Sequence, residues 1–117
     1  AVLQLVRSNI GPLGAMAKGQ IDYDADVMTT NSLRIGQLAM MMGDYFELDT
    51  RKFPVKTGAR DIIWEEMDDF KSKTQDLINA AANLQQVALA KDQSNYRSAI
   101  GDLGSTCKAC HDKFKKD

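Results

Sequence analysis

Two cysteines and a histidine lie close together near the end of the chain, at Cys107, Cys110 and His111. They are the only cysteines and the only histidine among the 117 residues. On a helix, positions i, i+3 and i+4 share one face, so all three side chains can reach one flat ligand. Two thiols at this spacing, followed directly by an imidazole, form the attachment pattern of c-type haem. The spacing therefore predicts one covalently bound haem c, with both thiols bonded to the macrocycle and His111 bound to the iron.

Three other interpretations of these residues are weaker. A structural zinc site needs four ligands, and the chain has only three Cys or His residues. A thioredoxin-like redox pair belongs at a helix N-terminus in a βαβ setting, whereas this pair falls near the end of a helical stretch with no strand pattern before it. The third alternative is a chance pair of cysteines joined in a plain disulfide.

Length and composition predict a single domain over residues 1–117 with an ordinary core. Hydrophobic residues make up 44% and charged residues 26%, and the formal net charge is −1. That charge argues against nucleic acid as a main partner, because a surface that follows phosphates needs a basic excess. No apolar run approaches the roughly 18 residues that span a membrane, so we expect no membrane partner.

The start of the chain is already helix-like and has no capping residue, so we expect a leader and a few further residues upstream. Thioether attachment of haem takes place outside the bacterial cytoplasm. The haem interpretation therefore predicts a periplasmic protein.

Four stretches carry apolar residues spaced alternately three and four apart, which is the period of a helix bundle. The four predicted seams are Leu3, Val6, Ile10, Leu13 and Ala17; Met28, Asn31, Ile35, Leu38, Met42 and Tyr45; Ile63, Met67, Phe70, Thr74, Leu77, Ala81 and Leu84; and Tyr96, Ile100, Leu103, Cys107, Cys110 and Phe114. This pattern predicts an all-α protein, an antiparallel four-helix bundle. Because both cysteines fall on a core-facing seam, we expect the haem to be held inside the bundle.

The ends of the first two helices have local signals. Pro12 removes a helical hydrogen bond, so the first helix should kink or end near it. Gly19 is the expected C-cap of that helix. Asp24 or Asp22 is the expected N-cap of the second helix.

The second half of the chain begins after a long predicted loop, Glu47 to Gly58. The third helix should carry Asp61, Glu65 and Glu66 near its positive end. The fourth should begin near Asp92 or Ser94.

Gly101 and Gly104 lie inside the fourth predicted helix, where each costs roughly 1 kcal/mol relative to alanine. We favour close helix–helix packing as the reason for these two glycines. Room for the haem edge or a propionate is the alternative.

The four seams and the C-terminal attachment motif together resemble cytochrome c′, a periplasmic four-helix haem protein, over the whole chain. The landmarks of the resemblance are Cys107-Lys108-Ala109-Cys110-His111-Asp112, the basic Lys115, the Lys18-Gly19-Gln20 turn with Tyr23-Asp24-Ala25 after it, and Phe46. The resemblance implies a five-coordinate iron with His111 on one side and no protein ligand on the other. It also implies binding of nitric oxide and carbon monoxide, with poor binding of dioxygen.

The same resemblance places Leu3 over the open side of the iron, with Phe46 as a second wall. An apolar pocket agrees with this selectivity, because it offers no donor to stabilise polar bound dioxygen, whereas nitric oxide needs little such help. Ordinary core packing is the alternative role for Leu3.

Lys115 lies one helical turn beyond His111, so its ammonium can lie beside the proximal face. The family usually has arginine there, and lysine offers a point charge in place of a planar fork. The alternative is that Lys113, Lys115 and Lys116 together oppose the negative end of the last helix dipole.

The chain has six methionines, at positions 16, 28, 40, 41, 42 and 67. A thioether ligand would make the iron six-coordinate and the protein a plain electron carrier. Low-spin relatives of the bundle carry methionine at about the position of Leu3, whereas Met16 lies roughly 20 Å along the helix from it. We interpret all six as core filler.

The function that these residues favour is binding of diatomic gases, for nitric oxide sequestration or sensing. An electron-transfer protein with an unknown redox partner is the alternative. An enzyme such as a peroxidase needs distal acid–base groups, which a chain without a second histidine does not offer. We therefore expect no enzymatic activity.

Several apolar residues are left on outward positions: Leu5 on the first helix, and Leu33, Met40 and Met41 on the second. Contiguous exposed apolar surface usually marks an interface. The resemblance points the same way, since cytochromes c′ commonly pair through their first two helices. We therefore expect a homodimer, although scattered single surface residues of this kind also occur without any role.

Overall fold

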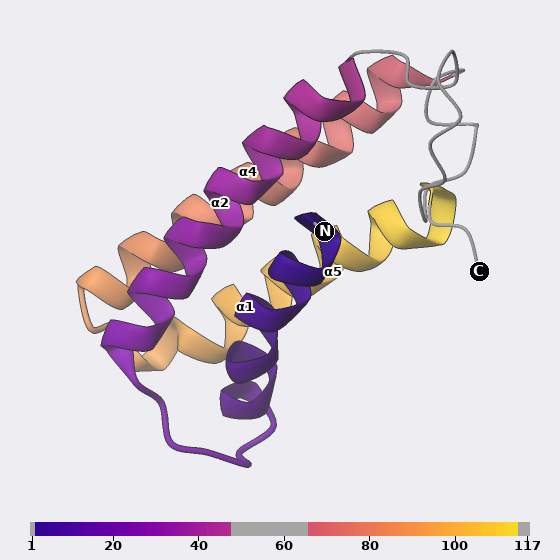
Figure 1. Ribbon diagram of the computed structural model, residues 1–117. Helices are drawn as coiled ribbons and strands as arrows, with labels where there is room; N and C mark the ends of the chain where they lie inside the picture. The colour runs from indigo at the N-terminus through magenta and orange to yellow at the C-terminus, as the bar shows by residue number, and fades with distance from the viewer. Residues whose placement is uncertain (1, 48–65, 115–117) are drawn as a thin grey trace.

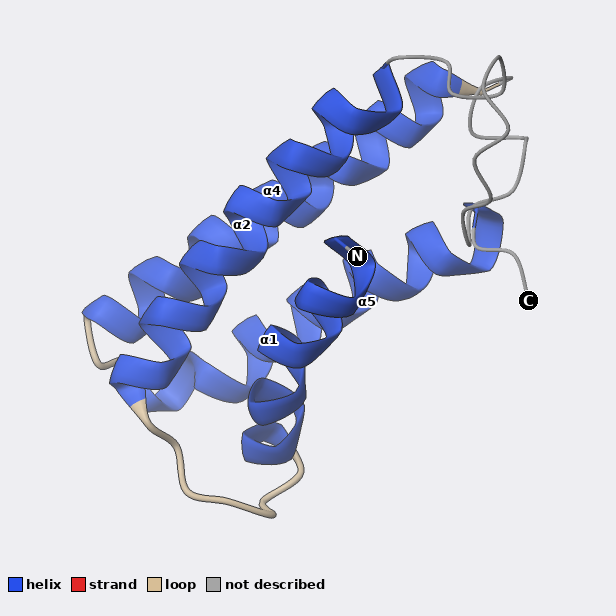
Figure 2. Cartoon of the chain, viewed as in Figure 1, coloured by secondary structure: helices blue, strands red, loops and turns tan. Residues whose placement is uncertain are grey.

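The computed structural model describes residues 2–47 and 66–114, without the side chains at positions 2, 3, 43, 45–47 and 114. Its helices are α1 (Val2–Ala17), α2 (Ala25–Glu47), α4 (Met67–Leu89) and α5 (Tyr96–Phe114), with a short 3₁₀ turn, η2 (Gln93–Asn95), before α5. The described residues contain no strand (Figure 2). The four α-helices form an antiparallel bundle, which confirms the predicted fold class (Figure 1).

The predicted seams form the core of this bundle. α2 lies alongside α4, α5 packs against α4, and α1 packs against α2 and α5 (Figure 1). The buried apolar cluster joins all four helices through Leu13, Met16, Met28, Ile35, Ala39, Leu77, Ala81, Leu84, Ala88, Tyr96, Ala99, Ile100 and Leu103. The helical period therefore identified the inward face of each helix correctly.

Pro12 does not end the first helix. α1 runs through it to Ala17, so the expectation of an end near Pro12 was wrong. Beyond the proline, Leu13 and Met16 are 0% and 2% exposed. Burying two such side chains contributes about 1.5–3 kcal/mol each, which offsets the roughly 3 kcal/mol that an interior proline costs.

The turn between α1 and α2 uses the expected caps. Gly19 has a φ of 75°, and its N–H donates to the carbonyl of Met16 at 3.1 Å, while the N–H of Gln20 donates to that of Ala15 at 2.9 Å. This is a Schellman ending. At the start of α2, Asp24 Oδ1 accepts hydrogen bonds from the N–H groups of residues 26 and 27, at 3.0 and 3.1 Å. Gly19 is therefore the C-cap and Asp24 the N-cap.

The end of the bundle where α5 begins is tied to the α1–α2 turn. The rings of Tyr23 and Tyr96 lie 5.4 Å apart, and the Arg97 guanidinium donates two hydrogen bonds, of 3.0 and 2.8 Å, to the carbonyl of Ala17. Arg97 thus satisfies a carbonyl that the end of α1 leaves without a helical partner.

The turn between α4 and α5 is shaped by Asp92. Its carboxylate accepts hydrogen bonds from Ser94 Oγ at 2.8 Å and Asn95 Nδ2 at 2.6 Å. The hydrogen bonds from Asn95 and Ser94 hold the pKa of Asp92 below its usual range. The fourth long helix accordingly begins at Tyr96, after the short η2 turn.

The predicted loop Glu47 to Gly58 falls almost wholly outside the described residues, as do Asp61, Ile63 and Glu65 of the expected third helix. The described part of that helix has Glu66 at its N-cap position and Asp68 and Asp69 in its first turn. These acids suit the positive end of the helix dipole.

Close helix–helix packing does not explain Gly101 and Gly104. Both are exposed, and a Cβ at either position would meet no atom within 4 Å. Gly36 of α2 is the glycine that faces a neighbouring helix, because its Cβ would lie 3.7 Å from that of Ala81 on α4. The favoured interpretation of Gly101 and Gly104 was therefore wrong.

The N-cap of α2 is open to a direct test. Replacing Asp24 with alanine should lower the free energy of unfolding by about 1 kcal/mol, because two helix N–H groups lose their acceptor. Guanidinium unfolding followed by far-UV circular dichroism measures the change. Asp22→Ala, in the exposed turn before the cap, is the control and should change stability by less than about 0.5 kcal/mol. Equal losses in the two variants would contradict the cap.

Candidate haem site

The last part of α5 brings the three predicted site residues together. Cys107 and Cys110 are half-buried, and Cys107 packs against the apolar core cluster. His111 is exposed beside them, at the edge of the same face. The two cysteines lie on the same side of α5 as the buried residues Tyr96, Ile100 and Leu103. Packing at the start of α5 therefore determines the direction in which its last turns face.

The structure has no disulfide between Cys107 and Cys110. Burial raises the pKa of the Cys107 thiol. Burial also raises the pKa of Cys110, with the neighbouring Cys107 thiol adding to the shift. A redox-active pair needs a thiol with a lowered pKa, so the redox interpretation does not suit this environment.

These residues fit a haem and do not fit a bare metal ion. Within residues 2–47 and 66–114, no group of three or more His, Cys, Asp or Glu side chains could hold a metal ion. Gly104 lies seven residues before His111 and thus on the same stripe of α5. Since a Cβ there would meet nothing within 4 Å, the stripe has free space at Gly104, one turn before Cys107. Neutral thiols one turn apart, an adjacent imidazole and open space together suit a flat macrocycle.

A charged cluster that the sequence did not reveal borders this face. Lys113 Nζ lies 2.6 Å from Asp69 Oδ2 and 3.4 Å from Glu66 Oε1, and Lys73 Nζ lies 3.5 Å from Asp69 Oδ1. The Lys113 ammonium holds the pKa of Asp69 below its usual range, and Asp69 raises the pKa of Lys113. The cluster links the end of α5 to the start of α4. Lys113 therefore does more than oppose the helix dipole.

The predicted distal and proximal neighbours of the iron lie at the edge of what the structure describes. Leu3 is in the first turn of α1 and Phe46 in the last turn of α2, but their side chains are not described. Lys115 lies outside the described residues. The roles of these three residues stay predictions.

The methionines divide into two groups. Met16, Met28 and Met42 are buried, which confirms them as core filler. Met40 and Met41 are 52% and 53% exposed, so the core-filler interpretation was wrong for them, because they lie on the outward side of α2.

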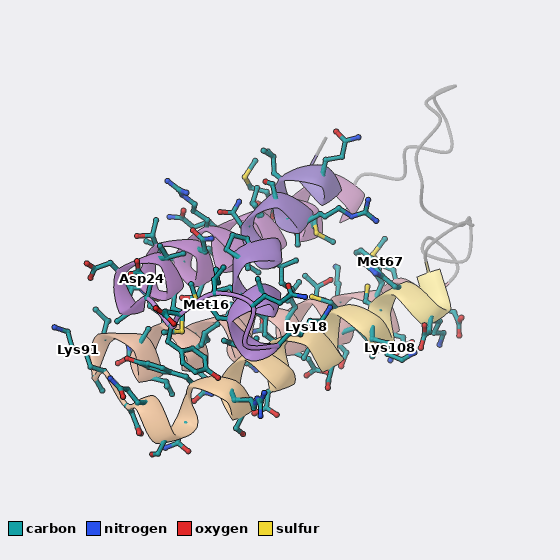
Figure 3. The ribbon with its side chains drawn as sticks, turned by 90° about the horizontal axis from the view of Figure 1, so that it is seen from below. Met16, Lys18, Asp24, Met67, Lys91 and Lys108 are labelled. Atoms are coloured by element: carbon teal, nitrogen blue, oxygen red, sulfur yellow. The ribbon has the colours of Figure 1, made fainter. Side chains whose placement is uncertain are left out.

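Figure 3 shows that Met16 lies far from the end of the bundle that carries Lys108 and Met67. Met67 is half-buried.

The residues predicted to lie on the outside of the bundle are exposed. The exposed fraction is 50% for Leu5 and 44% for Leu33, and Met40 and Met41 are exposed as well. An open groove of about 520 Å³ lies between α1 and α2 next to them. It is lined by Leu5, Ser8, Asn9, Asn31, Arg34, Gln37, Leu38 and Met41. At its floor, Asn31 Nδ2 donates a hydrogen bond of 3.0 Å to the carbonyl of Asn9, which joins the two helices. Leu5 and Met41 thus share one surface.

None of the described helices is long and apolar enough to cross a membrane.

Comparison with known proteins agrees with the haem interpretation. The family model described as Cytochrome C' matches residues 1–115. A cytochrome c' of Cereibacter sphaeroides is 36% identical over 113 residues, covering 95% of this chain and 75% of the relative. Cytochrome c prime from Shewanella frigidimarina has a similar solved structure, with a TM-score of 0.88, 34% identity, and coverage of 100% of this chain and 90% of that one.

A second solved structure is the nitric oxide complex of a leucine-to-alanine mutant of cytochrome c prime from Alcaligenes xylosoxidans. It has a TM-score of 0.85 and 32% identity, covering 99% of this chain and 88% of that one. With the matched family model and the paired thiols before His111, these likenesses cover almost the whole chain. The chain therefore belongs to the cytochrome c′ family, whose cofactor is covalently attached haem c.

Proposed function

We propose that this chain is a periplasmic haem protein that binds nitric oxide and carbon monoxide at a vacant apolar site, for sequestration or sensing of nitric oxide. Cys107 and Cys110 hold the macrocycle, and His111 binds the iron from one side. The observation that carries the proposal is that this chain has one histidine, and that the predicted seam of the first helix is apolar from Leu3 to Leu13. An iron bound by His111 then has no second imidazole for its other side.

When bound, the haem supplies an iron with one free coordination position for a diatomic gas. The chain decides what can reach that position. Leu3 and Phe46 exclude water and offer no hydrogen-bond donor, which disfavours dioxygen relative to nitric oxide. Lys115, one turn beyond His111, places a positive charge beside the proximal face. The Alcaligenes relative supports gas binding, since one of its variants was solved as a nitric oxide complex.

Electron transfer is the competing function, and a methionine ligand is what would favour it. Met16 and Met28 are 2% and 0% exposed within the apolar cluster that contains Leu13 and Ile35. Thioethers packed there fill core space. This placement supports the gas-binding proposal.

Covalent attachment through both thiols can be tested by mass. Under denaturing conditions the protein should be heavier than its polypeptide by one haem, because thioether bonds survive unfolding. Cys107→Ser or Cys110→Ser should keep the haem through the remaining thiol, and the double variant should release it. A wild-type mass equal to the bare polypeptide would rule out covalent attachment.

The vacant site predicts an optical response. The ferrous protein should have a high-spin, five-coordinate spectrum that changes when carbon monoxide is added, because His111 leaves one coordination position free. A low-spin spectrum that does not respond to carbon monoxide would instead establish the electron carrier with a second protein ligand.

Binding of carbon monoxide also tests whether Leu3 crowds the open side of the iron. Leu3→Ala should increase the association rate of carbon monoxide, because a smaller side chain opens the approach to the iron. Leu89→Ala is the matched control, since Leu89 is 58% exposed near the end of α4. If Leu3→Ala and Leu89→Ala both bind carbon monoxide at the wild-type rate, Leu3 does not crowd the site.

We propose further that two copies of the chain pair through α1 and α2. Leu33 and Met40 are seven residues apart and therefore on one side of α2. Gln37 lies one turn after Leu33 and one turn before Met41, so it connects Leu33 and Met40 to Met41 on the helix surface. Met41 and Leu5 line the same groove between α1 and α2. A two-fold axis through this patch would bury each copy against its twin.

Sedimentation at micromolar concentration should therefore show a dimer. Leu33→Lys or Met40→Lys should produce a monomer that keeps its haem, because a buried lysine charge opposes pairing. Leu89→Lys places the same charge on an equally exposed residue outside the patch and should leave the dimer intact. A wild-type monomer, or equal dissociation by Leu89→Lys, would exclude this interface.

A further inference from the structure

The last turns of α5 have little apolar support within the described residues. Leu103 is fully buried, but every described residue from position 104 to position 113 is half-buried or exposed. The ends of helices fray when packing does not hold them, because their last carbonyls have no helical partner. The turn that carries His111 therefore depends on contacts other than a buried core.

Lys113 supplies such a contact across the helix–helix boundary. Its ammonium lies between two carboxylates of α4, at 2.6 Å from Asp69 and 3.4 Å from Glu66. Asp69 is itself paired with Lys73 at 3.5 Å. A single exposed pair contributes little, but a cation shared by two carboxylates in a network is better held.

The α4 side of this contact is firmly placed. Asp69 precedes Phe70, whose side chain is 2% exposed in the core. The Thr74 hydroxyl donates a hydrogen bond of 2.8 Å to the carbonyl of Phe70, within the same turns of α4. Asp69 is therefore fixed to the bundle, and Lys113 is the partner whose helix it restrains.

The cluster also borders the haem-attachment face. Lys113 lies three residues after Cys110, on the same side of α5. The ionic contact thus lies next to the residues that hold the haem.

We propose that Asp69 and Lys113 are positioning residues for His111. Their ion pair fixes the rotation of the last turn of α5 against α4, and with it the direction in which the imidazole meets the iron. This role rests on the proposed ligation of iron by His111.

The test compares variants of the haem-containing protein. Asp69→Asn and Lys113→Gln remove one charge each with little change in shape. Backbone amide hydrogen exchange in residues 110–114 should become roughly three- to tenfold faster in both, because the last turn opens more often. The iron–histidine stretching band in the resonance Raman spectrum of the ferrous protein should shift or broaden. The double variant should change no more than Lys113→Gln alone, because that substitution already removes both pairs that Lys113 forms, with Asp69 and with Glu66.

Two further variants separate positioning from charge. Lys108→Gln removes the pair between Lys108 and Asp112, which is 2.9 Å long and lies within α5, so it changes net charge without releasing α5 from α4. It should leave the exchange rates and the band at their wild-type values. Lys113→Arg keeps a cation that can reach Asp69 and should also retain both values.

Wild-type exchange and an unchanged band in Asp69→Asn and Lys113→Gln would overturn the positioning role. Equal shifts in Lys108→Gln would overturn it too, because net charge would then be the cause. A wild-type protein without an iron–histidine band would instead overturn ligation by His111, which is a failure of the proposed function.

Discussion

The helical period of α5 is the constraint on which the site depends. One stripe of this helix must bury Tyr96, Ile100 and Leu103 and also present Cys107 and Cys110. Because side chains three and four residues apart share a face, packing at the start of the helix decides where both thiols face at its end. The attachment site is thus oriented by core residues on the preceding turns of the same helix.

Much of the fold could be predicted because its causes are local. The inward face of each helix follows from apolar spacing, and the caps at Gly19 and Asp24 follow from the chemistry of single residues. The course of α1 through Pro12 could not be predicted in this way, because it depends on burial of Leu13 and Met16 by other helices. The same holds for Gly36, whose close approach to α4 depends on how two helices are placed.

The residues of the candidate site could likewise be predicted only where their cause is local. The attachment motif, Cys107, Cys110 and His111, could be proposed from the sequence because covalent haem attachment needs two cysteines and a histidine at fixed spacing. The contact between Asp69 and Lys113 joins residues 44 positions apart. Each has a sufficient local explanation, since an acid suits the start of a helix and a base suits its end. Only the packing of α4 against α5 shows that they meet.

The two ends of the bundle are stabilised by different means. Where α5 begins, the ring of Tyr23 packs at a tilt against that of Tyr96, and Arg97 caps α1, near the buried side chains of Leu13 and Met16. Where α5 ends, the described side chains are half-buried or exposed, and an ionic contact links the helices. Haem held by the proposed bonds to Cys107 and Cys110 would add a large apolar group at this second end. It would supply apolar contact where the described side chains of α5 bury little, and the proposed role of the ion pair is to keep the helix end in place beside it.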